Sequence, residues 1–146
     1  PEHSECDAEV RVSSVTFARV CKELRIMGNT CTIQCTATKM GWGVTGDVGK
    51  ALTVLQQAPP NATPTTAPAP PEGHDSNAVH ITCNVSSVTQ SFSLKYLQLF
   101  AKFGTLAPYV DLQLTADGPM LVQFRAHEQH ATSYVRLYLA PKSDNV

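Results

Sequence analysis

The sequence is poor in charged and aromatic side chains and has no long hydrophobic run. Of its 146 residues, 16% are charged and 7% are aromatic. Eleven Lys and Arg residues oppose twelve Asp and Glu residues, which gives a formal net charge of −1. This balance excludes a strongly basic nucleic-acid binder of the histone type but permits a basic face on a neutral body. Because no stretch approaches the roughly 18 consecutive apolar residues of a transmembrane helix, we expect no membrane partner.

A regular cysteine framework is also absent. The cysteines are odd in number and irregularly spaced, at Cys6, Cys21, Cys31, Cys35 and Cys83. A chain of this length can build a core without disulfides, and 42% of its residues are hydrophobic. We therefore expect reduced thiols in a cytosolic or nuclear protein.

Residues 57–77 stand out because they are rich in proline, alanine and threonine and show no apolar period. Such a stretch cannot bury one face, so it predicts an extended loop. The loop joins two units of similar size, about residues 1–56 and 78–146. In the first unit, the pattern predicts a strand at 8–12, a helix at 14–27 and strands at 30–36, 40–46 and 50–56.

The second unit repeats this order. Strand-like runs occur at 79–85 and 88–92, a helix is expected over about 93–103, and further strands are expected at 109–115, 120–126 and 133–139. A strand–helix–three-strand unit that occurs twice indicates an internal repeat and favours an α+β fold.

Each predicted helix has an apolar side and a basic side. At 100° per residue, the apolar sides contain Phe17, Val20, Cys21, Leu24 and Met27 in the first helix and Tyr96, Leu97, Phe100 and Phe103 in the second. The basic sides contain Arg19, Lys22 and Arg25 in the first helix and Lys95 and Lys102 in the second.

Two solvated amphipathic helices would explain this sorting of charge. A solvated face normally mixes Lys with Glu, however, and Glu23 is the one acidic residue in the two helices. If both helices cover the same side of one sheet, their basic side chains form a surface that contacts phosphates without reading base sequence.

The sequence offers little support for a metal site or for catalysis. Cys31 and Cys35 with His127 and His130 could be combined into a zinc site, but cysteines four apart in a strand share one side, and we expect that side to be the core. A thiol hydrolase built on Cys21 or Cys83 stays a formal alternative, although nothing in the sequence orients a base. No glycine-rich phosphate loop precedes a helix. We expect no cofactor, no metal and no enzymatic activity.

Several segments resemble one family closely. Residues 91–124 (SFSLKYLQLFAKFGTLAPYVDLQLTADGPMLVQF) and 134–142 (YVRLYLAPK) are similar to the C-terminal domain of the eukaryotic DNA sliding clamp, the proliferating cell nuclear antigen family. Residues 17–24 (FARVCKEL) and 33–49 (IQCTATKMGWGVTGDVG) resemble the first half of that domain. The likeness covers nearly the whole chain apart from the loop, and the pair TADGP and YLAPK is its most specific part.

The resemblance implies an α+β DNA-clamp fold, with two helices on one face of an antiparallel sheet, and a ring. In this family three subunits, each with two like domains, encircle duplex DNA, with helices lining the hole and sheets outside. The chain corresponds to the second domain, and Pro1-Glu2 resembles the end of the connector, so the N-terminal clamp domain and the connector are expected to be absent from this sequence. A nuclear processivity factor and docking platform for replication and repair proteins is implied, without catalysis.

The resemblance also implies roles for particular residues. The family's hole-facing cations correspond to Arg11, Arg19, Lys22, Lys95 and Lys102, and helix geometry adds Arg25. The pocket for partner peptides carrying the clamp-binding motif, the PIP box, corresponds to Asp117, Gly118, Pro119, Tyr138, Leu139, Ala140 and Pro141. The strand that pairs with the next subunit corresponds to Lys50, Ala51, Leu52, Thr53, Val54, Leu55 and Gln56.

The implied partners are duplex DNA, DNA polymerases, the clamp loader, and the tails of ligases and nucleases, with a homotrimer as the full-length form. The family's ubiquitin-acceptor lysine corresponds to Ala37, with Lys39 two residues further on. The alternatives are a subunit of the related checkpoint clamp, against which the TADGP and YLAPK pair argues, and an α+β protein-interaction module that binds no DNA.

Overall fold

A computed structural model describes residues 6–58, 77–125 and 134–142 of the chain. In these residues the first half of the sequence forms β1 (Ala8–Ser13), α1 (Ser14–Met27), β2 (Thr30–Cys35), β3 (Lys39–Gly46) and β4 (Gly49–Gln57). The second half forms β5 (Ala78–Cys83), β6 (Val88–Ser93), α2 (Leu94–Ala101), the 3₁₀ helix η1 (Lys102–Leu106), β7 (Tyr109–Leu114), β8 (Met120–Arg125) and β9 (Tyr134–Leu139). The strand–helix–three-strand order therefore occurs twice, with β5 between the two units, and the predicted α+β class is confirmed.

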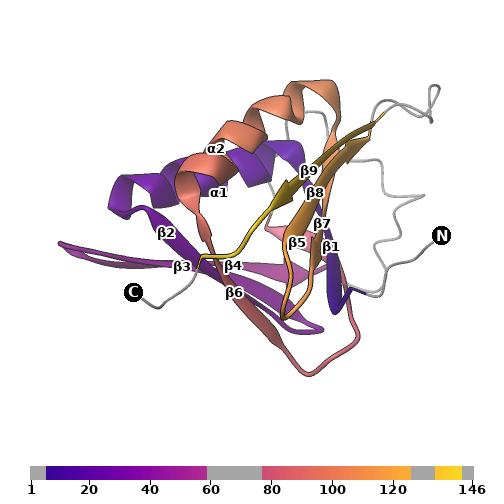
Figure 1. Ribbon diagram of the computed structural model, residues 1–146, viewed down its shortest axis with the longest axis horizontal. Coiled ribbons are helices and arrows are strands. Elements are labelled where there is room, and N and C mark those ends of the chain that lie inside the picture. Colours follow the sequence, from indigo (N-terminus) through magenta and orange to yellow (C-terminus); the bar gives the residue numbers. More distant parts are fainter. Residues whose placement is uncertain (1–5, 59–76, 126–133, 143–146) are drawn as a thin grey trace.

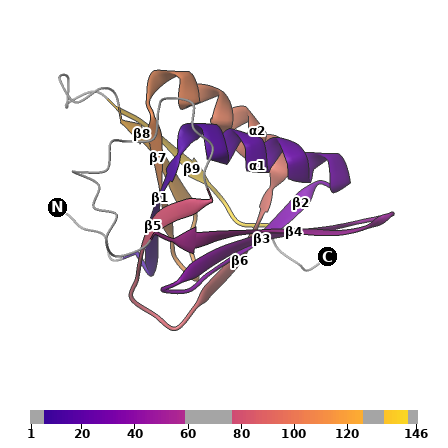
Figure 2. The same ribbon diagram turned by 180° about the vertical axis from the view of Figure 1, so that it is seen from behind.

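The described strands form a single sheet in the order β6-β2-β3-β4-β5-β1-β7-β8-β9. The sheet is bent into two arms, and the two helices lie side by side across the inner side of the bend (Figures 1 and 2). Each strand that precedes a helix pairs with the other unit: β1 pairs with β7, and β6 pairs with β2. Among the described strand pairs, only β4 and β5 run parallel, through Gln56 and Gln57, and this short contact joins the two arms.

Local signals fix the start and end of α1. The Ser13 hydroxyl accepts a hydrogen bond from the backbone N–H of Thr16, which satisfies one donor of the first turn. At the other end, the N–H of Gly28 donates to the carbonyl of Leu24. The helix predicted for residues 14–27 is therefore confirmed at both ends.

The second helix is shorter than predicted. Ser93 caps it through the N–H of Tyr96, but the α-helix ends at Ala101 and the chain continues as a 3₁₀ helix through Gly104 to Leu106. Gly104 comes so close to α1 that a Cβ built on it would lie 3.1 Å from Ser14 Cβ. Glycine weakens an α-helix and permits this close approach, so the same residue ends the regular helix and packs the two helical segments together.

The core lies between the helices and the sheet, and Phe17 of α1 is at its centre. The Phe17 ring contacts Trp42 on β3 edge-to-face at a centroid distance of 6.0 Å and Phe124 on β8 at 6.3 Å. All three side chains are buried. Because β3 and β8 belong to different arms, these ring contacts connect both arms to one helix.

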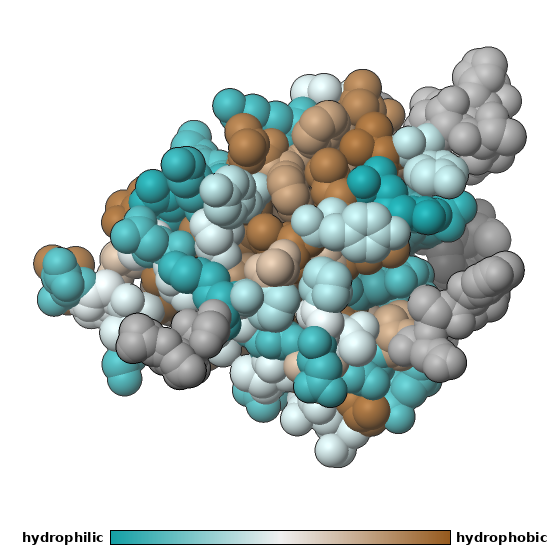
Figure 3. Space-filling model, viewed as in Figure 1, coloured by the Kyte–Doolittle hydropathy of each residue, from teal (hydrophilic) through white to brown (hydrophobic). Residues whose placement is uncertain are grey.

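The apolar side predicted for the second helix is partly wrong. Leu94 and Leu97 are the buried residues of α2, whereas Tyr96 is 48% exposed. Phe103 is 36% exposed, but its ring lies 6.2 Å from that of the buried Phe124, so it still packs toward the core as predicted. Tyr96, Leu99 and Leu106 leave apolar surface on this helical segment, and Figure 3 shows hydrophobic residues gathered at the top of the view. Among the described helices, none is long and apolar enough to cross a bilayer.

Gly46 provides a sharp test of this packing. A Cβ built at Gly46 would overlap the carbonyl oxygen of Met27 at the end of α1, whereas one at Gly43 would lie 3.8 Å from its nearest neighbour, a Leu52 side-chain atom. We expect Gly46→Ala to lower the free energy of unfolding by about 1–3 kcal/mol, since backbone must move to relieve the overlap. Urea denaturation followed by circular dichroism measures this, with Gly43→Ala as the matched control. Equal stability of the two variants would contradict the packing described here.

Candidate nucleic-acid interface and partner surface

The helices present their basic side chains on the side of the molecule away from the sheet. Lys22 on α1, Lys95 on α2 and Lys102 at the start of η1 are all exposed. No carboxylate within the described part of the chain forms an ion pair with these three lysines. The two helices lie on one face of the sheet, as predicted, and these three lysines are exposed on them. Their role in DNA binding stays a prediction.

The two helix arginines are less available than the lysines. Arg19 pairs with Glu23 at 3.1 Å and donates to Asn77 Oδ1 at 2.7 Å. Arg25 donates to Asn29 Oδ1 at 2.8 Å, at the end of the same helix. These contacts hold both guanidinium groups in place.

Arg11 does not belong to this surface. On β1, Val10 and Val12 are buried, and Arg11 points to the opposite side because successive strand residues alternate. The register pairs Val12 with Val110 and Val110 with Phe124, whose ring contacts Phe17 of α1, so the valine side is the helix side. The prediction that Arg11 faces the same direction as the helix cations is therefore wrong.

The predicted peptide-binding residues do come together. The register of β8 and β9 pairs Met120 with Leu139, so the preceding turn lies beside the tail that leaves β9. The residues of this surface are Asp117, Gly118, Pro119, Tyr138, Ala140 and Pro141; within it Tyr138 is 62% exposed. Leu139 differs from the others because its side chain packs into the core and is 8% exposed, so it supports this surface from beneath.

Two polar side chains from distant segments hold the turn. The amide nitrogen of Gln90 on β6 donates to the carbonyls of Thr115 at 2.8 Å and Ala116 at 2.6 Å, and lies 3.5 Å from that of Gly118. On the other side, Asp7 Oδ2 accepts a bond of 2.7 Å from the N–H of Ala116. Neither residue was predicted to take part, since both act through contacts between segments remote in sequence.

The tail is anchored to the opposite edge of the sheet. The N–H of Lys142 donates to the Ser91 carbonyl on β6 at 2.7 Å, and its Nζ donates to Thr30 Oγ1 on β2 at 2.8 Å. The chain leaving β9 therefore crosses from one end of the sheet to the other. This crossing fixes Ala140 and Pro141 beside the turn.

The strand predicted to pair between subunits has a free side. Every residue from Lys39 to Gly46 of β3 pairs with β4, but β5 contacts β4 only through Gln56 and Gln57. Within the described residues, no strand covers the second side of residues 49–55. Leu52 on this segment is 70% exposed.

Three of the five cysteines lie in the core. Cys31 and Cys35 are buried on the core side of β2, and His127 and His130 lie outside the described residues. Burial raises the pKa of the Cys31 thiol to about 12, and burial with the nearby Cys83 raises that of Cys35 to about 12. Burial likewise raises the pKa of Cys21. These three thiols are core residues.

The raised pKa values predict slow alkylation. At pH 8 a thiol with a pKa of about 12 is a thiolate in roughly one molecule in ten thousand, and it also has to reach the reagent through the core. We expect iodoacetamide to leave Cys21, Cys31 and Cys35 unmodified in the native protein and to modify them in urea. Peptide mass spectrometry measures this. Rapid native alkylation of Cys21 would instead favour the thiol-hydrolase alternative, which was built on Cys21 or Cys83.

The chain matches the family model described as "Proliferating cell nuclear antigen, C-terminal domain" over residues 1–142. A match of this length, together with the bent sheet and its paired helices, defines a domain of the DNA sliding clamp class. The chain belongs to the proliferating cell nuclear antigen C-terminal domain family. This family is one of scaffolds rather than enzymes.

Proposed function

We propose that the chain is the second domain of a nuclear DNA sliding clamp that acts as a processivity factor and docks replication and repair proteins. The observation that carries this proposal is the exposure of Lys22, Lys95 and Lys102 on two helical segments that lie side by side across one face of the sheet (Figure 1). Lysines at such positions attract the phosphate backbone without reading bases, so they permit sliding. The full-length protein would add a first clamp domain and a connector and form a homotrimeric ring.

The free side of β4 supports ring assembly. An unpaired strand edge with an exposed leucine is a template for pairing with another chain. In the proposed ring, Lys50, Ala51, Leu52, Thr53, Val54 and Leu55 pair with the first domain of the next subunit. Gln56 was predicted to belong to this edge, but it is already paired with β3 on one side and β5 on the other. The ring topology, not tight binding, then keeps the protein on DNA.

The surface at Pro119 and Tyr138 supports docking. A partner tail from a polymerase, clamp loader, ligase or nuclease would insert an aliphatic and two aromatic side chains there. Burial of such side chains contributes about 1.5–3 kcal/mol each, and the ordering of a flexible tail offsets several kcal/mol. The expected affinity is about micromolar, which suits a platform whose partners exchange.

DNA binding can be tested with single lysine variants of the full-length protein. We expect Lys95→Ala to weaken binding to a short duplex and to make the slope of log K against log salt shallower by about 0.9, as for the loss of one phosphate contact. Fluorescence anisotropy across a salt series measures both quantities. Lys39→Ala, at an exposed lysine of β3 outside the helix layer, is the matched control. An equal effect of the two substitutions would remove the helix layer as the DNA surface.

Partner binding can be tested with a labelled peptide that contains the clamp-binding motif between uncharged flanks. We expect Tyr138→Ala and Pro119→Ala to weaken binding to the full-length protein by about tenfold or more, since each removes apolar contact area. Gln90→Leu should weaken peptide binding less, because it removes the hydrogen bonds that hold the turn but leaves the residues that contact the peptide unchanged. Tyr134→Ala, two strand positions before Arg136 on the same side of β9, serves as the control. Unchanged affinity in Tyr138→Ala and Pro119→Ala would remove this assignment.

A further inference from the structure

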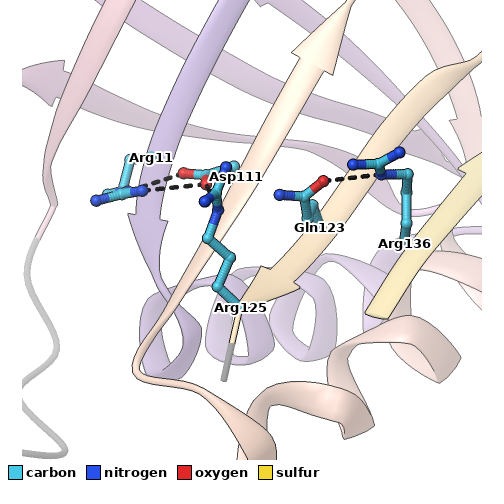
Figure 4. Close-up of polar contacts among 5 residues, drawn as sticks. All are labelled: Arg11, Asp111, Gln123, Arg125 and Arg136. Atoms are coloured by element: carbon cyan, nitrogen blue, oxygen red, sulfur yellow. Dashed lines mark hydrogen bonds and ion pairs between the residues drawn. The ribbon is translucent and has the colours of Figure 1, made fainter. Parts of the chain in front are cut away.

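A row of polar side chains crosses the face of the sheet opposite the helices. The strand registers place Arg11 beside Asp111, Asp111 beside Gln123 and Gln123 beside Arg136, across β1, β7, β8 and β9. Arg125, two residues after Gln123, lies on the same face and reaches Asp111 as well (Figure 4). We call Arg11, Arg125 and Arg136, with their partners Asp111 and Gln123, the arginine row.

The arginine row has a net positive charge, because it contains three arginines and a single carboxylate. The Asp111 carboxylate, whose side chain is 9% exposed, accepts bonds of 2.8 and 3.2 Å from Arg11 and lies 3.6 Å from Arg125. One carboxylate therefore faces two guanidinium groups, of which the Arg125 side chain is 60% exposed. Burial of Asp111 is tolerable because these two arginines compensate its charge.

Arg136 forms no ion pair with a carboxylate of the described residues, and a neutral side chain and an aromatic ring hold it in place. Its Nε donates to Gln123 Oε1 at 2.9 Å, and its guanidinium lies 4.7 Å from the centre of the Tyr134 ring. A neutral acceptor and an aromatic face orient the guanidinium but leave its charge uncompensated. An oriented guanidinium is well suited to pair with a carboxylate through two parallel hydrogen bonds.

The row continues the surface proposed for partner peptides. Arg136 and Tyr138 are two positions apart on β9, point to the same side and are separated by about 7 Å along the strand. A peptide seated against Tyr138 therefore has its flanking residues within reach of Arg136, and then of Arg125 on the neighbouring strand. Glu9, on the same face, lies three strands from Tyr138, about 14 Å away, so it does not oppose an acidic group at Arg136.

We propose that the arginine row binds acidic residues that flank the inserted motif of a partner peptide, and so favours partners with an acidic flank. This inference rests on the proposed peptide-binding function of the Tyr138 surface. Duplex DNA is the less suitable occupant, since Asp111 lies within the row and the row faces away from the helix lysines.

The test compares three labelled peptides on the full-length protein. All contain the same clamp-binding motif; one has uncharged flanks, one has four Glu residues before the motif, and one has four after it. We expect one of the acidic peptides to bind about three- to tenfold more tightly than the uncharged peptide in 50 mM salt, and this ratio to approach one in 300 mM salt. Fluorescence anisotropy measures each dissociation constant.

The variants Arg125→Gln and Arg136→Gln, alone and combined, locate the effect. The combined variant should reduce the ratio to about one while it leaves the affinity for the uncharged peptide within twofold. Lys39→Gln, which removes one exposed positive charge on the other arm, should keep the ratio. Arg11 is left unchanged so that Asp111 retains a partner in every variant.

Each other result overturns the inference in a recognisable way. Equal affinity for the three peptides in the unmodified protein overturns it and leaves the proposed peptide-binding function standing, whereas failure of all three to bind overturns both. If the combined variant still binds the acidic peptide more tightly than the uncharged one by the same factor, the acidic flank contacts another part of the protein and the inference is wrong. If the combined variant instead loses duplex binding and keeps the ratio, the row is a DNA surface and the inference is wrong.

Discussion

The contact of one phenylalanine with two aromatic rings organises this domain. Phe17 packs against Trp42 in one arm of the sheet and against Phe124 in the other, so α1 determines the angle between the arms. The helix layer can present its lysines on a common surface only while both arms are held beneath it. The turn at Pro119 depends on the same angle, because Gln90 reaches it from the other arm.

The two faces of the sheet carry different sets of basic side chains. Lys22, Lys95 and Lys102 lie on the helix layer, where no described carboxylate pairs with them and their charge is available to a polyanion. On the opposite side the arginines are fixed by Asp111, Gln123 and Tyr134, so they are oriented for partners of defined geometry. This division explains why a chain with a formal net charge of −1 can still have two cationic surfaces.

Much of the fold could be predicted because its signals are local. The cap at Ser13, the period of α1 and the alternation of the strands all act over a few residues. The alternation of Val10, Arg11 and Val12 also contained the correct side for Arg11, but the family resemblance assigned it to the helices. Contacts that join remote segments, such as those of Gln90 and Asp7 with the turn, have no local signal and could not be predicted.

The exchange of first strands between the two units has a consequence for how the chain can be divided. Residues 6–58 alone would contain β1 without its partner β7 and β2 without its partner β6. Each half would therefore expose strand edges that pair with the other half in the intact domain. The halves are therefore not interchangeable modules. A polypeptide severed within the proline-rich connection would regain this architecture only by complementation, as two fragments that recombine into one body.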